Sequence, residues 1–207
     1  MKLYYSPAAC SLSPHIVARE LGIALELDKV DLKARQTASG RDYAKINAKG
    51  YVPALELDDG QVLTEGPAIV QYLADQKPAS GLAPANGTFA RSRLQEMLGY
   101  INSEIHKAYS PLFKDDTPDI TRNERKAYLQ RRYQWIENIL ARQDWLVGDR
   151  FSVADAYLFT VTRWADGVKL DLAAFPALQK FQQRVAARPA VQAAMQAEGL
   201  LDQKAAA

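Results

Sequence analysis

The hydrophobic period of the chain changes once, between residues 78 and 87. Before this segment, short apolar runs alternate with amphipathic stretches, which is the pattern of strands alternating with helices. After it, apolar residues recur every three or four positions, as in packed helices. The segment itself is rich in Pro, Gly, Ser and Asn, which is typical of a linker. The sequence therefore predicts an α/β domain over 1–77, a linker over 78–87 and an all-helical domain over 88–207.

The first domain has the order βαβ followed by ββα. Strands are predicted at residues 2–5, 25–30, 51–57 and 61–63, and helices at 11–21 and 64–73, with 33–49 at most loosely helical. A helix between the first two strands favours a parallel pair, because a crossover connection returns the chain to the same end of the sheet. The Asp-Gly turn at 59–60 favours an antiparallel hairpin at the edge.

The second domain contains a long amphipathic helix followed by shorter ones. The apolar stripe of the first helix steps by four, three, four, three and four through Leu94, Leu98, Ile101, Ile105, Ala108 and Leu112. Further helices are expected around 129–140, from Ser152, from Pro176 and from Pro189. Ser152-Val153-Ala154-Asp155 resembles a capping box with Asp in place of Glu.

The composition excludes several classes of protein. Of the 207 residues, 48% are hydrophobic and 24% charged, which indicates a globular chain rather than a disordered one. One cysteine cannot form an internal disulfide, and two histidines with one cysteine give no zinc-like cluster. A net charge of +2 does not favour nucleic acid or a membrane surface as partner. No apolar run approaches the ~18–20 residues of a membrane span, and the start lacks a secretory pattern. We expect a cytoplasmic protein without a metal.

Cys10 follows a predicted strand and directly precedes a helix start. A thiol there lies near unpaired amides and the positive end of the helix dipole, which favour the thiolate and lower its pKa. The alternative is an inert, buried cysteine. Ser13 stands where a CxxC pair would have its second cysteine, so an internal dithiol cycle is excluded, whereas a mixed disulfide with an external thiol is not.

Two further loops carry possible binding groups. The Val52-Pro53 bond begins a strand, and a cis bond there would turn backbone groups outward to pair with an extended peptide, although base rates favour trans. Glu65 and Gly66 lie at a helix N-terminus, where the carboxylate can hold an ammonium and the amide can hold a carboxylate. That pair of charges is the head of an α-amino acid. Simple helix capping is the alternative.

His106 belongs to a polar face of the long helix. Gly99, Ser103, His106 and Ser110 step by four, three and four, beside the apolar stripe. Such a helix can pack a core with one face and line a cleft with the other, although a solvated face is the usual explanation. His15 is expected to be structural or exposed. Tyr4 and Tyr5 must point to opposite faces of the sheet, and either hydroxyl could reach the region of Cys10.

Taken in order, these motifs resemble those of the glutathione transferases, most of all the bacterial beta class. The resemblance covers nearly the whole chain. Its motifs are Tyr-Ser-Pro-Ala-Ala-Cys-Ser at 5–11, Gly-Tyr-Val-Pro-Ala-Leu at 50–55, Leu-Thr-Glu-Gly-Pro-Ala-Ile at 63–69, Ser-Glu-Ile-His-Lys at 103–107 and Phe-Ser-Val-Ala-Asp at 151–155. It implies a thioredoxin-like fold with a cis bond at Pro53 for the first domain, and a helical domain that lines the site of an electrophile.

The implied ligand is glutathione as co-substrate, without a metal. Cys10 would lie beside the glutathione sulfur, stabilising its thiolate or forming a mixed disulfide. Val52, followed by the cis Pro53, would pair with the cysteinyl part. Glu65 and Gly66 would hold the γ-glutamyl head. Many relatives have Ser where this chain has Gly66, and this removes a hydroxyl contact.

From the helical domain, His106 would border the sulfur and the electrophile together with Ser103 and Lys107, and Cys10 and His106 are the implied catalytic residues. Arg35 stands where the family usually has lysine and would meet the glycyl carboxylate, which a guanidinium can bind in a bidentate manner. Lys33 is a neighbouring candidate.

Three classes of function follow from the resemblance. The first is conjugation of glutathione to small hydrophobic electrophiles, including dehalogenation. The second is a glutathione-dependent thiol–disulfide reductase that uses Cys10, and the third is a non-catalytic binding protein on the same fold. The presence of Cys10, Glu65 and His106 argues against the third. The resemblance also implies a homodimer, for which Phe89 and Met97 are candidate exposed contacts.

Overall fold

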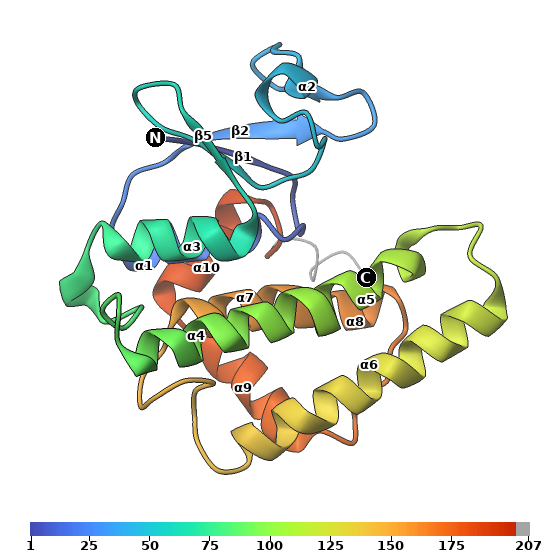
Figure 1. The fold of residues 1–207 in the computed structure, drawn as a ribbon. Helices are drawn as coiled ribbons and strands as arrows, with labels where there is room; N and C mark the ends of the chain where they lie inside the picture. The colour runs from blue at the N-terminus through green and yellow to red at the C-terminus, as the bar shows by residue number, and fades with distance from the viewer. Residues whose placement is uncertain (202–207) are drawn as a thin grey trace. The chain divides into compact units, whose positions relative to one another are not determined.

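The computed structural model describes residues 1–201 and divides into two compact units. Within the described residues, one unit comprises Met1–Ser80 with residues 186–201, and the other comprises Gly81–Val185. Figure 1 shows a sheet with helices in the first unit and helices alone in the second, which confirms the predicted fold class. Among residues 1–201, no helix has both the length and the apolar composition that a membrane crossing requires.

The sheet of the first unit is mixed and has the strand order β3-β2-β1-β4-β5. The strands are β1 (Lys2–Tyr5), β2 (Glu26–Asp31), β3 (Gln36–Thr37), β4 (Ala54–Glu56) and β5 (Val62–Thr64). As predicted, β1 pairs with β2 in parallel, and β4 and β5 form an antiparallel hairpin, which joins β1 through β4. The sequence did not predict β3, which pairs with β2 inside the stretch expected to be loosely helical.

Successive side chains of a strand point to opposite faces of the sheet, and in this sheet both faces are covered. Leu3 and Tyr4 are neighbours in β1, and both are fully buried. In Figure 1 the helices α1 (Leu12–Glu20) and α3 (Gly66–Asp75) lie along one face, and α2 (Tyr43–Ile46) lies across the other. Tyr4 belongs to the α2 face, where its ring lies 5.7 Å from that of Tyr43.

The Tyr4 hydroxyl forms hydrogen bonds within a polar cluster at the sheet surface. It donates to Glu56 and accepts from Arg41, whose guanidinium also lies 2.7 Å from the Glu56 carboxylate. This hydrogen bond from Tyr4 is the main cause that lowers the pKa of Glu56. The Tyr4 hydroxyl therefore anchors the α2 side of the sheet, and it is not directed toward Cys10.

The last helix, α10 (Pro189–Ala197), packs against α1 in the first unit. Its residues Val191 and Ala194 are fully buried, and Arg188 binds the Glu20 carboxylate at 2.6 and 2.9 Å. Because α1 lies between the sheet and α10, every residue from Leu12 to Ala18 is buried. The division differs here from the predicted one, which assigned all of 88–207 to the helical domain.

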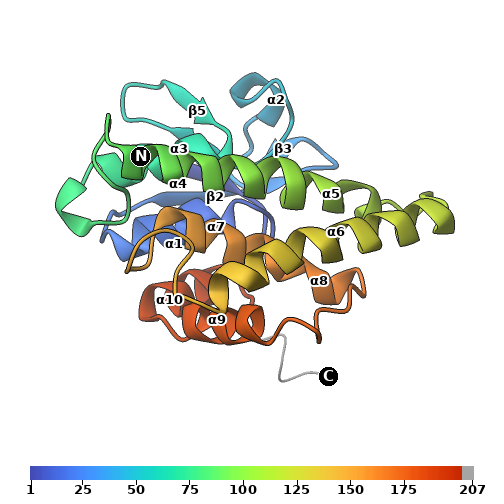
Figure 2. The ribbon, with the colours of Figure 1, turned by 60° about the horizontal axis from the view of Figure 1, so that its bottom comes forward.

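The second unit is helical throughout. Its elements are α4 (Phe89–Tyr100), η2 (Ile101–His106), α5 (Lys107–Tyr109), η3 (Ser110–Phe113), α6 (Asp119–Leu140), α7 (Val153–Thr162), α8 (Trp164–Gly167) and α9 (Pro176–Ala186). Figure 2 shows α4 and α5 following one line with α6 beside them. The predicted apolar stripe from Leu94 to Leu112 is buried, but η2 interrupts its α-helix as a π-helical turn. A π-helical turn is rare and is often found at functional sites.

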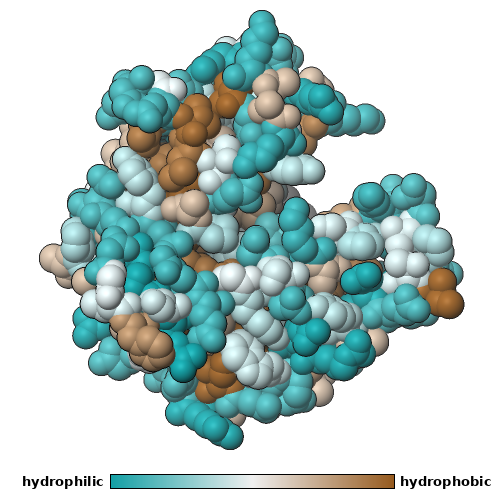
Figure 3. Space-filling model, viewed as in Figure 1, coloured by the Kyte–Doolittle hydropathy of each residue, from teal (hydrophilic) through white to brown (hydrophobic). Residues whose placement is uncertain are grey.

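The core of the second unit is built around α7, which is buried on every side. Ser152 and Asp155 form the predicted capping box at its start. On the face seen in Figure 3, mostly hydrophilic residues cover α4 and α6, as expected for amphipathic helices whose apolar stripes face inward.

Candidate functional site

Cys10 lies in the loop between β1 and α1, two residues before the helix begins, and is partly exposed. Its thiol donates a hydrogen bond to the carbonyl oxygen of Val52, with 3.2 Å between sulfur and oxygen. The peptide bond from Val52 to Pro53 is cis, as the resemblance implied. The structure thus brings together three of the predicted site residues, although 42 positions separate Cys10 from Val52 along the chain.

The loop that carries Cys10 is fixed from two directions. The Ser11 hydroxyl accepts from the Ser6 amide at 3.2 Å and donates to the Ser6 carbonyl at 3.1 Å, so it closes the loop and makes no capping hydrogen bond to α1. From the other side, the Ala8 amide donates to Glu198 Oε2 at 3.3 Å. Ala8 has a φ of 61°, a left-handed conformation that an alanine adopts only where its surroundings impose it.

Glu198 also holds His15, which is buried and structural, one of the two predicted outcomes for this residue. His15 Nδ1 lies 2.9 Å from Glu198 Oε1, and Arg19 Nε donates to His15 Nε2 at 3.4 Å. Because Nε2 accepts, the ring proton is on Nδ1 and is donated to the carboxylate. Glu198 therefore links α1 to the Cys10 loop, and no local pattern in the sequence indicated this role.

Replacing Glu198 with glutamine is expected to lower the free energy of unfolding by ~2 kcal/mol, because its amide group cannot accept from both the buried His15 Nδ1–H and the Ala8 amide. Chemical unfolding measures this loss. Glu26→Gln is the matched control, since the exposed Glu26 carboxylate forms an ion pair with Lys2, and it should change stability by less than ~0.5 kcal/mol. Equal stability of the Glu198 variant and wild type would contradict the linking role.

A second loop, residues 47–53, holds Val52 in place. The Tyr51 carbonyl accepts from the Tyr43 hydroxyl and from the Asn47 amide group, each at 2.7 Å. Tyr43 and Asn47 are both buried, and burial raises the pKa of Tyr43 to about 12, so its hydroxyl stays protonated as a donor. These two hydrogen bonds therefore fix the peptide group between Tyr51 and Val52. Sequence reasoning missed Tyr43 and Asn47, which lie in the stretch expected to be loosely helical.

Glu65 lies at the start of α3, with a φ of 73° that turns the chain from β5 into the helix. Its carboxylate binds the Lys49 ammonium at 2.6 Å. The Glu65 side chain is 61% exposed, and an exposed ion pair contributes only ~0–1 kcal/mol. A ligand ammonium can therefore replace Lys49 at little cost. Gly66, the next residue, is buried as the first residue of the helix.

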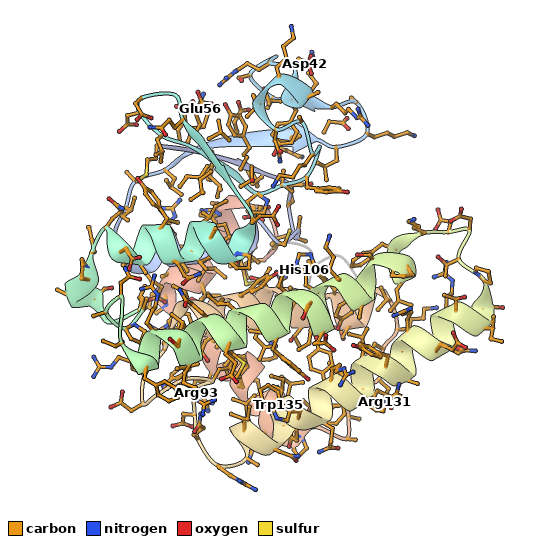
Figure 4. All side chains as sticks on the ribbon, viewed as in Figure 1. Asp42, Glu56, Arg93, His106, Arg131 and Trp135 are labelled. Carbon is orange, nitrogen blue, oxygen red and sulfur yellow. The ribbon has the colours of Figure 1, made fainter. Side chains whose placement is uncertain are left out.

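In the second unit, the His106 ring lies among aromatic side chains. Its Nδ1 is 2.5 Å from the Tyr157 hydroxyl, and its centroid is 5.0 Å from that of Trp164. Figure 4 shows His106 on the long helical segment that begins with α4. Ser103, a member of the predicted polar face, and the neighbouring Lys107 are exposed on the same segment, and the Ser103 hydroxyl donates to Glu104 at 3.3 Å.

Comparison with known proteins identifies the family. Residues 8–76 match the model of the glutathione S-transferase N-terminal domain, and residues 100–189 match that of the C-terminal domain. The chain is 48% identical over 200 residues to the glutathione S-transferase GstA of Escherichia coli O157:H7, covering 97% of this chain and 100% of the relative. The chain belongs to the glutathione S-transferase family.

Solved structures of bacterial glutathione S-transferases have the same fold. The ternary complex of BphK, a bacterial glutathione S-transferase, has a TM-score of 0.95 and 55% identity, covering 97% of this chain and 100% of that one. The sphingomonad enzyme complexed with glutathione has a TM-score of 0.94 and 48% identity, with the same coverage. The beta-class enzyme of Sphingomonas chungbukensis has a TM-score of 0.94 and 44% identity, again with the same coverage. The resemblance to the beta class is thereby confirmed.

Within this glutathione S-transferase, the predicted site residues fall into two groups. The first unit holds Cys10, Val52, Pro53, Glu65 and Gly66, connected through residues 47–53. The second unit holds Ser103, His106 and Lys107.

Arg35 lies in the first unit but outside the connected group. Its φ is 55°, and its backbone carbonyl accepts from the Tyr43 amide at 2.9 Å. Among residues 1–201, its guanidinium makes no hydrogen bond or ion pair. Lys33 is likewise exposed in this loop. No group of three or more His, Cys, Asp or Glu side chains within the described part of the chain could hold a metal ion.

Proposed function

We propose that this transferase conjugates the thiolate of glutathione to small hydrophobic electrophiles. The observation that carries the proposal is the connected group in the first unit: a thiol at Cys10, the Val52 backbone beside it, and a carboxylate at Glu65 that already binds an ammonium. A γ-linked peptide with an ammonium head and a central cysteine is complementary to this order of groups. In the proposal, Glu65 and Gly66 hold its γ-glutamyl end.

The remaining residues complete the proposed glutathione site. Val52 pairs with the cysteinyl part, and Arg35 meets the glycyl carboxylate with a guanidinium that has no other partner among residues 1–201. Ser103, His106 and Lys107 act from the helical domain. His106 and Cys10 are the proposed catalytic residues, next to the sulfur.

The reaction forms one carbon–sulfur bond. The glutathione thiol loses its proton, and the sulfur electron pair attacks the electrophilic carbon, from which a halide or another leaving group departs with its bonding electrons. An enzyme accelerates such a step by increasing the fraction of thiolate and by holding both reactants close together. An aromatic cluster in the second unit supports the binding of an apolar electrophile. The ring centroids of Phe113 and Tyr109 lie 5.4 and 5.5 Å from that of Trp164.

Replacing Cys10 with alanine is expected to abolish a mixed disulfide between the protein and glutathione, while conjugation keeps a large part of its rate. The physical reason is that glutathione brings its own sulfur, so Cys10 assists the reaction without being the attacking atom. Mass spectrometry of the intact protein after incubation with oxidised glutathione checks the first result, and turnover of a chloronitrobenzene checks the second. Complete loss of conjugation would contradict the assisting role.

The alternative activity is thiol–disulfide exchange, which the partial exposure of Cys10 favours. The ratio of rates with a chloronitrobenzene and with a disulfide substrate separates the two activities, and we expect conjugation to be faster. Retention on immobilised glutathione without turnover of either substrate would instead indicate a non-catalytic binding protein.

We further propose that the protein is a cytoplasmic homodimer. Phe89, at the start of α4, is 74% exposed, which is unusual for a large apolar side chain and is consistent with cover by a second copy. Met97, the other predicted contact, is buried within its own unit and contributes nothing to this argument. Sedimentation equilibrium of wild type and Phe89→Ser tests the proposal, and the variant should dissociate more readily.

A further inference from the structure

Tyr157 connects two side chains of the π-helical turn η2. Its hydroxyl donates to Asn102 Oδ1 at 2.9 Å, and the same oxygen lies 2.5 Å from His106 Nδ1. Tyr157 is part of the buried helix α7, so neither contact is an accident of an exposed side chain. Asn102 and His106 are the second and the last residue of the turn, four positions apart, and one hydroxyl contacts both.

The hydrogens available to Asn102, Tyr157 and His106 determine which ring nitrogen of His106 is protonated. A tyrosine hydroxyl has one hydrogen, and Asn102 Oδ1, which can only accept, receives it. The short contact with His106 then requires a hydrogen from the ring, so Nδ1 must carry it. A neutral imidazole has a single N–H, which leaves Nε2 with its lone pair.

We propose that Tyr157, oriented by Asn102, is a positioning residue that fixes neutral His106 as its Nδ1–H tautomer and makes Nε2 the proton-accepting atom. The ring is also held edge-on by Trp164 and Tyr157, at interplanar angles of 64° and 76°, which opposes rotation of the imidazole. All four side chains belong to the second unit, so the inference depends on that unit alone.

The chemical consequence rests on the proposed function. If His106 borders the sulfur, Nε2 can accept the thiol proton: the S–H bond breaks, its electron pair stays on sulfur, and the ring becomes an imidazolium with hydrogens on both nitrogens. The opposite tautomer would present an N–H donor at Nε2 and could not accept this proton. Tyr157 thus acts through His106 and not on the ligand.

The test is the nitrogen spectrum of the two histidines in the chain, recorded on protein labelled with ¹⁵N-histidine at a pH where the rings are neutral. The His106→Gln variant assigns the signals of His106 by their disappearance. We expect a pyrrole-type signal for Nδ1 and a pyridine-type signal for Nε2. The reverse assignment in the wild-type protein would overturn the proposal.

Variants of Asn102 supply the control. Asn102→Ala releases the Tyr157 proton, which can then be donated to Nδ1, so the Nε2–H tautomer should become the major form. Asn102→Asp keeps an acceptor and should retain the wild-type tautomer. Tyr157→Phe should behave like Asn102→Ala, whereas Tyr128→Phe, which removes a hydroxyl bonded to Glu104, should change nothing at His106. An unchanged tautomer in Asn102→Ala would overturn the proposal.

Activity separates this inference from the proposed function. With the tautomer as expected, Asn102→Ala should lower kcat for conjugation about tenfold near neutral pH, with the KM for glutathione within about twofold of wild type, since ~1.4 kcal/mol corresponds to one factor of ten. The expected tautomer in a protein that never conjugates glutathione would contradict the proposed function and leave the assignment of the ring protons intact.

Discussion

Replacing Glu65 with glutamine is expected to weaken glutathione binding about 100-fold, because charge-assisted hydrogen bonds to an ammonium contribute ~1.5–3 kcal/mol and each 1.4 kcal/mol is a factor of ten. Loss of the Glu65 carboxylate should not disturb the fold, so a change in affinity can be attributed to the lost contact with glutathione. The Glu65 side chain is exposed and does not cap α3, and within residues 1–201 its one hydrogen bond is to the Lys49 ammonium. Titration calorimetry with glutathione measures the change.

Two comparisons sharpen this experiment. Glu26→Gln removes an exposed carboxylate that pairs with Lys2 and should leave glutathione affinity within about twofold of wild type, as for most surface substitutions. The unfolding transition of Glu65→Gln should lie close to that of wild type, since an exposed ion pair contributes little to stability. If the folded Glu65 variant bound glutathione with wild-type affinity, this would contradict the proposal that Glu65 binds the γ-glutamyl ammonium.

The second large effect is on stability: Asp155→Ala is expected to lower the free energy of unfolding by ~4 kcal/mol, because removing the acceptor leaves buried donors unpaired at ~1–3 kcal/mol each. Asp155 is completely buried and accepts three hydrogen bonds, from the Leu146 amide at 2.9 Å, the Ser152 amide at 2.8 Å and the Ser152 hydroxyl at 2.7 Å. Urea unfolding measures the loss.

The matched control is Asp149→Ala, a few residues earlier in the same connection. Its carboxylate is exposed and forms an ion pair with its neighbour Arg150, at 3.2 Å. We expect its effect to stay within ~0.5 kcal/mol, as for other surface substitutions. A loss below ~1 kcal/mol for Asp155→Ala would show that the capping box is not needed to hold α7, whose ten residues form the core of the second unit.

The sequence predicted those parts of the fold that depend on local signals. The Asp-Gly turn marks the hairpin of β4 and β5, and Pro67 in the first turn of α3 is where a helix accepts proline without losing a hydrogen bond. The capping box at Ser152 is confirmed residue by residue. Cys10 and Val52 were chosen on separate grounds, and the structure brings them into contact.

Other features depend on contacts between distant residues and have no local signal. The strand β3 has only two residues, and it is defined by its antiparallel pairing with the edge of β2. The π-helical turn η2 leaves the order of apolar and polar residues unchanged, so a periodic pattern cannot reveal it. Glu198 reaches His15 across 183 positions, and Tyr43 and Asn47 support Val52 from a polar stretch without a motif.

The central claim is that the loops around Cys10, Val52 and Gly66 together hold glutathione. The most direct measurement is a titration of ¹⁵N-labelled protein with glutathione, followed through the backbone amide shifts. We expect saturable binding with the largest shifts at these three positions and their neighbours. The absence of any shift at millimolar glutathione, or shifts confined to other parts of the chain, would contradict the claim.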